Sequence, residues 1–403
     1  MAEQPSHRQG RRRPLLVALT ALGLAGCALV PAPAVQAPPP AAAAPPAEPV
    51  RTAPPPLTEA SPPPTRDLPR DEARNRVAVL VPLSGPNAGV GQSLANAATL
   101  ALLDAGGDRI RLTVYDTAKT GAAAAAQQAL ADGNRLFLGP LLAEDVRAVA
   151  PVARRADVPV VSFSNDVSVA GSGVFLMGFT PSSSVARVVG YARAQGLARF
   201  AALTPRGVYG RRVGQAMIDA TERAGGRLVG IQEFDRDVAG LRAAAGRLGA
   251  YDAVLIADAA RTAALAVPAI RAAVPRAHIL GTELWGNDPA IGSVAGLRGA
   301  WYAAVPDTLF NQMRSRYRTR YGAAPYRLAS LAYDAVLLAI RTSRDWRPGG
   351  PYPQRALRDP AGFTGIDGAY RFAANGVAVR ALEVREVTAS GSVVVSPASD
   401  RED

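Results

Sequence analysis

Few residues in this chain could catalyse a reaction. It contains one cysteine and two histidines, His7 and His278. Serine hydrolysis needs a base to activate the hydroxyl, and beyond the N-terminal segment only His278 is available, inside an apparent strand. No serine lies in a Gly-x-Ser-x-Gly motif. We therefore expect His278 to be a core or edge residue and expect no hydrolase of this kind.

Acidic pairs and glycine-rich turns give no stronger catalytic signal. The pairs Asp235/Asp237 and Glu144/Asp145 could in principle hydrolyse glycosidic bonds, but both lie where helix caps or solvated loops are expected. The turn at residues 84–91 lacks the Gly-Lys-Ser/Thr of a phosphate loop and has leucine where the dinucleotide fingerprint needs its last glycine. One cysteine and two histidines cannot form a metal cluster of soft ligands. We expect no enzyme, no cofactor and no metal.

The single cysteine, Cys27, ends an apparent export signal. Arginines at residues 11–13 precede an apolar segment at 15–24, which is too short to span a bilayer, since a helix needs about 20 residues. The motif Leu24-Ala-Gly-Cys27 resembles the lipobox of bacterial lipoproteins. This resemblance predicts a signal peptide at residues 1–26 and acylation of Cys27. The next residue is Ala28 rather than Asp, which by the same resemblance favours the inner leaflet of the outer membrane.

A proline-rich segment follows the lipobox. Fifteen of the 34 prolines lie between Pro31 and Pro69, many of them in runs of two or three, and alanine is common between the runs. Such a composition cannot bury enough apolar surface to fold and favours polyproline II. At about 3.1 Å per residue, some forty residues reach roughly 100 Å. We predict that residues 27–74 form a lipidated, disordered linker, so that the globular part works at a distance from its membrane anchor.

The net charge of +12 suggests nucleic-acid binding only superficially. Lys119 is the only lysine, and the arginines are spread along the chain. Beyond the first fourteen residues there is no arginine run with interleaved aromatics. We expect no nucleic-acid partner, and membrane contact through the lipid anchor only.

From residue 75 onward, strand and helix patterns alternate. The run at residues 76–82 is continuously apolar, which is typical of a strand buried on both faces. The first series predicts strands at 76–82, 110–115, 136–139 and 159–163 and helices at 90–104, 121–131 and 144–156. This βαβ alternation predicts a parallel sheet covered by helices.

A second series of the same kind follows, after a short strand at 174–177 that should lead out of the first lobe. It predicts strands at 200–204, 228–234, 253–257 and 278–281 and helices at 182–194, 209–224, 238–247 and 261–274. Two helices at 309–321 and 327–342 come next, then short strands between 362 and 387 with turns at Asp367-Gly368 and Asn375-Gly376. The pattern predicts two similar α/β lobes in series.

Several stretches together resemble a known family. They are 82–87 (PLSGPN), 159–164 (PVVSFS), 208–210 (VYG), 332–335 (AYDA) and 362–368 (GFTGIDG). They look like type I periplasmic binding proteins of the branched-chain amino-acid class, over about residues 75–390. The resemblance implies two Rossmann-like lobes at 75–390, followed by a tail at 391–403.

Within that superfamily, three further stretches look most like the penicillin-binding-protein activator lipoproteins. They are 138–142 (LGPLL), 178–181 (GFTP) and 280–285 (LGTELW). Those proteins are outer-membrane lipoproteins that stimulate peptidoglycan synthases, so the resemblance implies a bifunctional penicillin-binding protein as partner. Some members carry a helical-repeat domain before the binding-protein-like domain. Here the linker stands in that place, so that domain's partner contacts cannot be transferred.

The family resemblance also implies residues of a ligand cleft. In amino-acid-binding members, a loop hydroxyl and backbone N–H groups hold the ligand carboxylate. The loop where that hydroxyl usually lies, residues 139–143, has none here. The resemblance implies ligand contacts for the loop hydroxyls of Ser162 and Ser164 and for a covering aromatic, Tyr209. Asp258 and Glu283 follow second-lobe strands and could neutralise an ammonium, with Trp285 as a lid, and the turn that contains Ser84 would shape the cleft rim. The alternative is that these residues are loop caps and interface polar groups.

Two functions of different classes follow. The first is a non-enzymatic, lipid-anchored regulator of peptidoglycan synthesis that acts by protein–protein contact, with a cleft ligand left open. The alternative is the solute-binding protein of an ABC importer for branched-chain amino acids or amides. An outer-membrane anchor and the missing loop hydroxyl favour the regulator. A third reading keeps the domain as a scaffold with a vestigial cleft.

Overall fold

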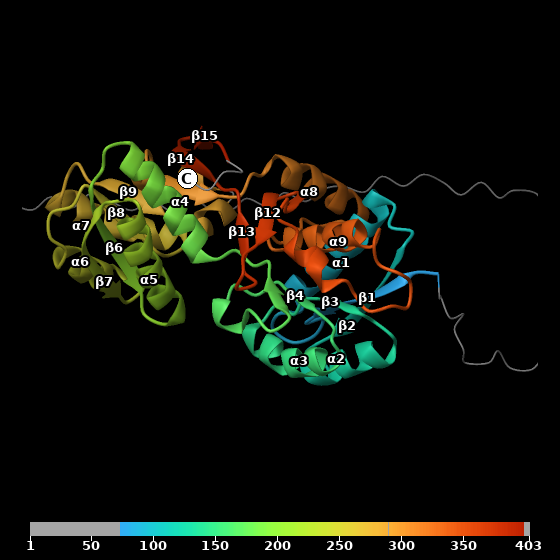
Figure 1. Cartoon of the computed structure of the whole chain (residues 1–403). Helices are drawn as coiled ribbons and strands as arrows, with labels where there is room; N and C mark the ends of the chain where they lie inside the picture. The colour runs from blue at the N-terminus through green and yellow to red at the C-terminus, as the bar shows by residue number, and fades with distance from the viewer. Residues whose placement is uncertain (1–72, 289, 399–403) are drawn as a thin grey trace, which may run out of the picture. The chain divides into compact units, whose positions relative to one another are not determined.

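The computed structural model describes residues 73–288 and 290–398. The predicted signal peptide, the lipidation site Cys27 and the predicted linker up to residue 72 lie outside the described residues. The described part consists of helices packed on mainly parallel sheets (Figure 1), which confirms the predicted α/β class. Within residues 73–288 and 290–398, no helix is both long and apolar enough to cross a membrane.

The first lobe is built on a five-stranded parallel sheet with strand order β2-β1-β3-β4-β5. Its strands are β1 (Asn75–Val81), β2 (Ile110–Asp116), β3 (Leu136–Leu138), β4 (Val160–Ser162) and β5 (Val174–Leu176). Side chains alternate across β1, so that Val77 and Val79 join one buried cluster and Ala78 and Leu80 join another. Burial on both faces explains the continuous apolar run in the sequence.

Helices cover both faces of this sheet (Figure 1). They are α2 (Ala122–Ala131) and α3 (Ala143–Arg155) on one face, and α1 (Ala88–Ala105), α8 (Thr308–Tyr321) and α9 (Ala329–Thr342) on the other. Leu94 of α1 and Val336 of α9 lie in one buried cluster, so a late segment of the chain completes the core of the first lobe.

The second lobe has a seven-stranded sheet with order β15-β14-β10-β9-β8-β6-β7. Its strands are β6 (Arg199–Pro205), β7 (Arg227–Phe234), β8 (Ala253–Ile256), β9 (His278–Gly281), β10 (Trp301–Ala304), β14 (Glu383–Thr388) and β15 (Gly391–Ser396). Its helices are α4 (Pro181–Ala194), α5 (Val208–Arg223), α6 (Val238–Gly246) and α7 (Ala260–Ala273). β14 and β15 are antiparallel to their neighbours, and the other strands pair in parallel.

A small antiparallel sheet packs into the core of the first lobe. It contains β11 (Phe363–Gly365), β12 (Gly368–Phe372) and β13 (Ala378–Arg380). Its turns lie at the predicted Asp367-Gly368 and Asn375-Gly376, where Gly368 and Gly376 have φ values of +85° and +84°. Short 3-10 helices complete the described elements: η1 (Val167–Val169), η2 (Glu283–Asn287), η3 (Ile291–Ser293), η4 (Ala295–Leu297) and η5 (Gln354–Arg358).

The chain crosses between the lobes at residues 177–180, 305–307 and 381–382. The lobes are therefore not arranged simply in series, because α8, α9 and the small sheet return to the first lobe and β14 and β15 return to the second. Residues 391–396, which the sequence analysis placed in the tail, form β15. Hydrophobic periodicity predicts whether a segment is a helix or a strand but not which lobe it packs in. The return of α8, α9, β14 and β15 to their lobes could therefore not be predicted from the pattern.

Candidate functional site

The predicted serines Ser162 and Ser164 lie at the end of β4 and are buried. The hydroxyl of Ser162 donates to the carbonyl of Pro140 at 2.8 Å and accepts from the N–H of Ser164 at 3.0 Å. The hydroxyl of Ser164 accepts from the N–H of Asp166 at 3.1 Å. Both side chains therefore hold backbone groups, of their own loop and, for Ser162, of the neighbouring loop at Pro140, which is the cap role considered as the alternative to ligand contact.

Asp166, in the same loop, was not predicted from the sequence and joins the two lobes. Its carboxylate pairs with Arg147 of α3 at 3.0 Å and with Arg212 of α5 at 2.5 Å. It also accepts hydrogen bonds from the N–H and the hydroxyl of Ser168. Burial favours the neutral carboxyl, but the bonds from Ser168 and Arg212 hold the pKa of Asp166 well below its ordinary value. Asp166 is thus a charged contact between the first lobe and α5.

Ser84 lies in the loop between β1 and α1 and is partly exposed. Asp116, at the end of β2, organises this loop by accepting the N–H groups of Leu83 and Ala118, each at 2.9 Å. The loop must be tight, because a Cβ on Gly91 would lie 1.7 Å from the carbonyl oxygen of Pro82. The structure thus places Ser84 on a tightly shaped turn, and its predicted role at a cleft rim stays a prediction.

Tyr209 and Glu283 of the second lobe, both predicted, lie against each other. The hydroxyl of Tyr209 lies 3.1 Å from Oε1 of Glu283 and 3.0 Å from Oγ1 of Thr282. Ser184 of α4 donates to Oε2 of Glu283 at 2.5 Å. Burial raises the pKa of Glu283, and the bonds from Ser184 and Tyr209 offset part of that shift. The result is a buried carboxyl group surrounded by neutral hydroxyls.

A pocket lies where the three crossing segments meet. Its empty volume, counted with the opening to solvent, is about 580 Å³. Phe179, Val305 and Leu382 line it, one from each crossing segment, and Glu283 lines it from the second lobe. Of the predicted cleft residues, only Glu283 is part of this pocket.

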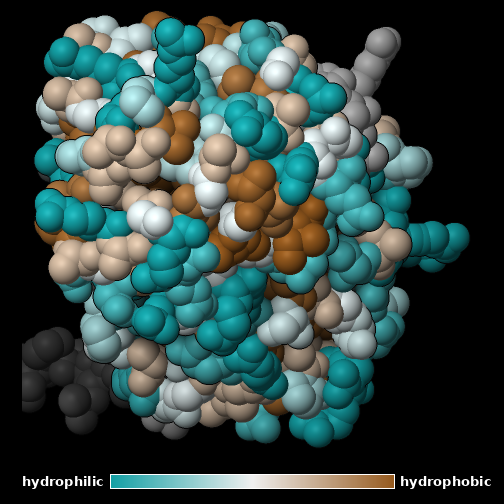
Figure 2. Space-filling view, turned by 90° about the vertical axis from the view of Figure 1, so that its left-hand side faces the viewer, coloured by the Kyte–Doolittle hydropathy of each residue, from teal (hydrophilic) through white to brown (hydrophobic). Residues whose placement is uncertain are grey.

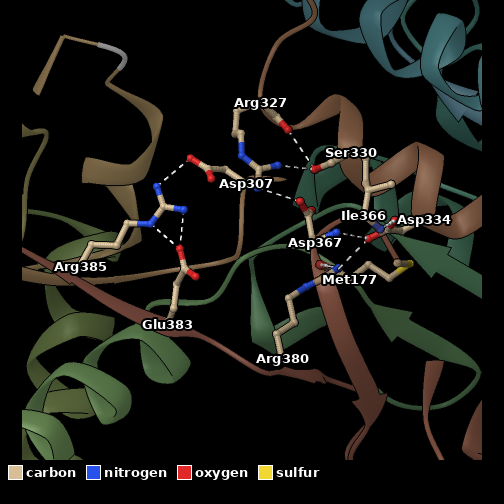
Figure 3. A network of polar contacts seen from close by, with 10 residues as sticks. All are labelled: Met177, Asp307, Arg327, Ser330, Asp334, Ile366, Asp367, Arg380, Glu383 and Arg385. Atoms are coloured by element: carbon tan, nitrogen blue, oxygen red, sulfur yellow. Dashed lines mark hydrogen bonds and ion pairs between the residues drawn. The ribbon is translucent and has the colours of Figure 1, made fainter. Parts of the chain in front are cut away.

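Arginines and carboxylates surround the pocket in the network of Figure 3. Nη2 of Arg327 lies 2.7 Å from Oδ1 of Asp367, and Nη1 of Arg385 lies 2.7 Å from Oδ2 of Asp307. Nε of Arg385 also donates to Glu383 at 2.5 Å. The Arg385 hydrogen bond lowers the pKa of Asp307, against the opposing effect of burial. The Arg385–Asp307 pair joins β14 of the second lobe to a crossing segment, and the Arg327–Asp367 pair lies within the first lobe.

The comparison with protein families identifies the family to which the chain belongs. Residues 75–392 match the model of the family described as periplasmic binding protein. The chain belongs to this family. The type I architecture and the family resemblance inferred from the sequence are thereby confirmed.

Solved structures of periplasmic binding proteins and their relatives share the fold. A putative branched-chain amino-acid ABC transporter protein from Rhodospirillum rubrum superposes with a TM-score of 0.68 at 20% identity, covering 80% of this chain and 100% of the other. The C-domain of LpoA from Haemophilus influenzae, described as a regulator of PBP1A, gives a TM-score of 0.65 at 18% identity, covering 80% and 100%. At these identities the likeness shows the fold alone.

One curated relative matches part of the chain. It is an uncharacterised protein of Rickettsia prowazekii, 27% identical over 149 residues, or 37% of this chain and 40% of that protein. The match therefore spans less than half of the relative's length. The structural neighbours are described as binding, transport or regulatory proteins rather than as enzymes.

Asp258 and Trp285, two of the predicted site residues of this periplasmic binding protein, are joined by a hydrogen bond in the second lobe. Asp258 is buried and accepts Nε of Arg236 at 2.6 Å, while its backbone carbonyl accepts Nε1 of Trp285 at 2.9 Å. Trp285 is 0% exposed and packs in the core beside Tyr302. The prediction that Trp285 acts as a lid is therefore corrected: the indole fills the space beneath Gly281, whose missing Cβ leaves room for it.

His278 has the structural role expected from the sequence. It begins β9 and its ring lies against Trp301, with centroids 3.5 Å apart. Burial lowers the pKa of His278 to about 4, although Glu386 acts in the opposite direction. The histidine is neutral at pH 7 and packs as an aromatic ring.

Sequence reasoning missed charged residues that pair across the fold. Asp166, Arg212, Arg327 and Arg385 lie in ordinary loop, helix or strand contexts and match no motif. Only the pairing of distant segments gives them their positions. Their one local signal is the Ser-Asn-Asp sequence at 164–166, which reads as a helix cap.

Proposed function

We propose that this chain is a lipid-anchored periplasmic regulator of peptidoglycan synthesis that acts by protein contact. A bifunctional penicillin-binding protein is the partner, and acylated Cys27 holds the chain on the inner leaflet of the outer membrane. The likeness to the C-domain of LpoA, described as a regulator of PBP1A, supports this function. The lipobox and the long linker support it independently, since they place a folded domain at a distance from the anchor.

One observation carries the choice of a regulator over an amino-acid carrier. The hydroxyl proton of Ser162 is donated to a backbone carbonyl, and the hydroxyl of Ser164 accepts a backbone N–H. The loop at 139–143 supplies no hydroxyl in their place. A ligand carboxylate would have to take the Ser162 proton from the carbonyl of Pro140, a bond that contributes about 1 kcal/mol. Ser162 is therefore poorly prepared to hold an amino-acid carboxylate.

The surface of the second lobe supports protein contact. Figure 2 views the side on which Figure 1 labels α6 and α7, and apolar residues gather in the middle of that face. On these two helices, Val238 and Leu265 are 49% and 44% exposed. Exposed apolar side chains that gather on one face are typical of interaction surfaces.

The test is the rate of glycan-strand synthesis by a purified bifunctional synthase from the same organism, with and without the full chain. We expect addition of the chain to raise the rate. The double variant Val238→Glu/Leu265→Glu should weaken the stimulation at least about tenfold, because charges would enter an apolar contact. Leu103→Glu is the matched control, since Leu103 is 54% exposed on α1 in the first lobe. Absence of stimulation by the wild-type chain would refute the proposal.

The alternative is the solute-binding protein of an importer for branched-chain amino acids or amides. The fold likeness to the Rhodospirillum rubrum protein favours it. Thermal denaturation with each amino acid and amide separates the two functions. A ligand at a hundred times its Kd stabilises the folded state by about 2.7 kcal/mol. A rise in Tm with leucine, isoleucine or valine, without synthase stimulation, would establish the importer instead.

A further inference from the structure

Helix α8 of the first lobe is rich in arginine. Arginine occupies every second position of residues 314–320 in the segment 314–321 (RSRYRTRY), and α8 contains no acidic residue. This segment corrects the expectation that no arginine run with interleaved aromatics lies beyond the first fourteen residues. Figure 1 shows α8 at the upper surface of the first lobe. The helix therefore places a concentration of positive charge on that surface.

The two tyrosines of this segment belong to the packing of α8 on α1. The hydroxyl of Tyr317 accepts from Nδ2 of Asn96 at 3.1 Å, and the hydroxyl of Tyr321 donates to the carbonyl of Asn96 at 3.0 Å. Tyr317 is buried, and the two rings lie against each other with centroids 4.7 Å apart. Binding of single-stranded nucleic acid needs exposed aromatic faces on which bases stack. The expectation of no nucleic-acid partner is therefore unchanged by this segment.

Three of the four arginines of α8 have no carboxylate partner in the described part of the chain. Arg316 pairs with Asp104 at 3.0 Å. Within the described residues, no ion pair involves Arg314, Arg318 or Arg320, and all three are exposed. The positive charge of α8 is therefore largely uncompensated by the folded domain and is available to an anionic partner.

The arginines lie on both sides of an uncharged ridge. Arg314 and Arg318 are one helical turn apart on one side of α8, and Arg316 and Arg320 are one turn apart on the other side. The residues between them, at the spacing of one helix face, are exposed and carry only hydroxyl or amide groups; this α8 ridge consists of Thr308, Asn311, Gln312, Ser315 and Thr319. The 14 residues of α8 make it about 21 Å long. A flat surface laid along the ridge therefore lies within reach of arginines on both sides.

A lipid surface suits this arrangement better than a protein surface. The phosphates of anionic lipids accept paired hydrogen bonds from a guanidinium group. Each basic side chain near an anionic membrane strengthens binding about fivefold. Protein interfaces instead depend on buried aromatic or aliphatic anchors, and the residues of the α8 ridge provide none. The proposed lipid anchor also keeps a membrane within reach of the linker, which joins the first lobe at Asn75.

We propose that the α8 ridge docks the first lobe on an anionic phospholipid surface, with Arg314 and Arg318 on one side and Arg320 on the other binding lipid phosphates. The proposal rests on the proposed function only for the anchor, which supplies the membrane. It replaces the expectation of membrane contact through the anchor alone. The predicted linker is long enough for the domain to leave the membrane, so the domain exchanges between docked and released states. Salt favours release, because the Debye length is only about 10 Å at 0.1 M ionic strength.

Sedimentation with lipid vesicles measures docking in the absence of the anchor. The full chain with Cys27→Ser, which cannot be acylated, is mixed with vesicles of phosphatidylcholine alone or with about one third phosphatidylglycerol. At low ionic strength we expect at least about tenfold stronger binding to the anionic vesicles. Most of this difference should disappear at about 0.3 M salt. Equal binding to the two kinds of vesicle would refute the proposal, and so would a preference that salt does not weaken.

Variants of exposed arginines locate the docking surface. Arg314→Gln/Arg318→Gln should weaken binding to the anionic vesicles at least about tenfold, and Arg320→Gln about fivefold. Arg154→Gln/Arg155→Gln is the matched control, because it removes the same charge from exposed positions at the end of α3, on the opposite face of the first-lobe sheet. This control should bind like the parent chain. Equal losses in the two double variants would assign the binding to net charge and refute docking through α8.

Soluble polyglutamate tests whether an acidic polypeptide is the partner instead. We expect it to compete with the anionic vesicles only weakly. Binding of polyglutamate as tight as that of the vesicles, and lost in Arg314→Gln/Arg318→Gln, would assign the α8 ridge to an acidic protein and overturn lipid docking. No synthase and no acyl chain take part in these measurements. Failure of lipid docking therefore leaves the proposed regulatory function standing, and absence of synthase stimulation leaves lipid docking standing.

Discussion

The two lobes solve the same packing problem in the same way but use their polar residues differently. In both, a helix begins against the end of a buried strand, and glycine allows the approach: Gly91 faces Pro82, and Gly210 faces Pro205. The loops beside these contacts then diverge. In the first lobe, the hydroxyl of Ser162 bonds backbone groups of two loops, at Pro140 and at Ser164. The second lobe instead buries a carboxyl group among hydroxyls.

This difference shows that loops at corresponding strand ends of the two lobes can have different polar environments. In the first lobe, the predicted serines are held by backbone groups of their own loop and of the neighbouring loop at Pro140, and the charge of Asp166 is compensated by Arg147 and Arg212. In the second lobe, no cation is shown within ion-pair distance of Glu283 among the described residues. We therefore expect the two carboxyl groups to respond to pH in opposite directions.

The largest expected effect concerns the shared glycines. Gly91→Ala and Gly210→Ala would each place a Cβ 1.7 Å from a backbone carbonyl oxygen. Since backbone must move to accept it, each change should cost about 4 kcal/mol or more of the free energy of unfolding. Gly190→Ala in α4 is the control, because no atom lies within 4 Å of the added Cβ. It should stabilise the helix by about 0.5–1 kcal/mol. Urea denaturation measures all three, and a large loss in only one lobe would break the parallel between them.

The next effect concerns the charged contact of Asp166. Asp166→Asn keeps the cap acceptor but removes the charge facing Arg212, so it should cost about 3 kcal/mol at pH 7. The folded pKa of Asp166 is lowered, so this stability is present above the unfolded pKa of about 3.9 and is lost as pH falls toward the folded value. Asp235→Asn, at an exposed pair with Arg206, should cost less than about 1 kcal/mol. Equal losses from the two changes in urea titrations would contradict the contact between lobes.

A smaller effect of opposite sign is expected for Glu283. Its folded pKa is raised, so its contribution is fully present below the unfolded pKa of about 4.3 and is lost as pH rises through the folded value. Glu283→Gln resembles the protonated group and should remove this loss, changing the stability difference between acid and neutral pH by about 1 kcal/mol. Chemical denaturation at a series of pH values measures it. A variant whose stability follows pH like the wild type would show that Glu283 does not titrate in this way.

The smallest effect is expected from Tyr209→Phe. Loss of its hydroxyl removes one bond to the Thr282–Glu283 pair and should cost about 1 kcal/mol. In a double-mutant cycle with Glu283→Gln, the two changes should couple by at least about 0.5 kcal/mol, because the groups are in contact. Strict additivity would mean that the second-lobe carboxyl group is held by Ser184 alone.

Local features of the fold were accessible from the sequence. The continuous apolar run of β1, the helix patterns and the Asp367-Gly368 turn gave the element types, and their bounds differ from the structure by one or two residues at most ends. The family resemblance was accessible because several short motifs, such as 208–210, lie along the residues that the family model matches. Of the site, the sequence placed Tyr209 and Glu283 after strands of the second lobe. The structure brings their side chains into contact.

The sequence by itself determined the α/β class, the succession of strands and helices, and the position of the turns, because these depend on local periodicity and on the conformational freedom of glycine. Only the tertiary structure decided that α8 and α9 return to the first lobe, that Trp285 is a core residue, and that Arg380 is buried beside Asp334. The physical reason is that burial and ion pairing depend on which distant segments of the chain come into contact. The sequence pattern shows the type of each residue but not which residue it will contact.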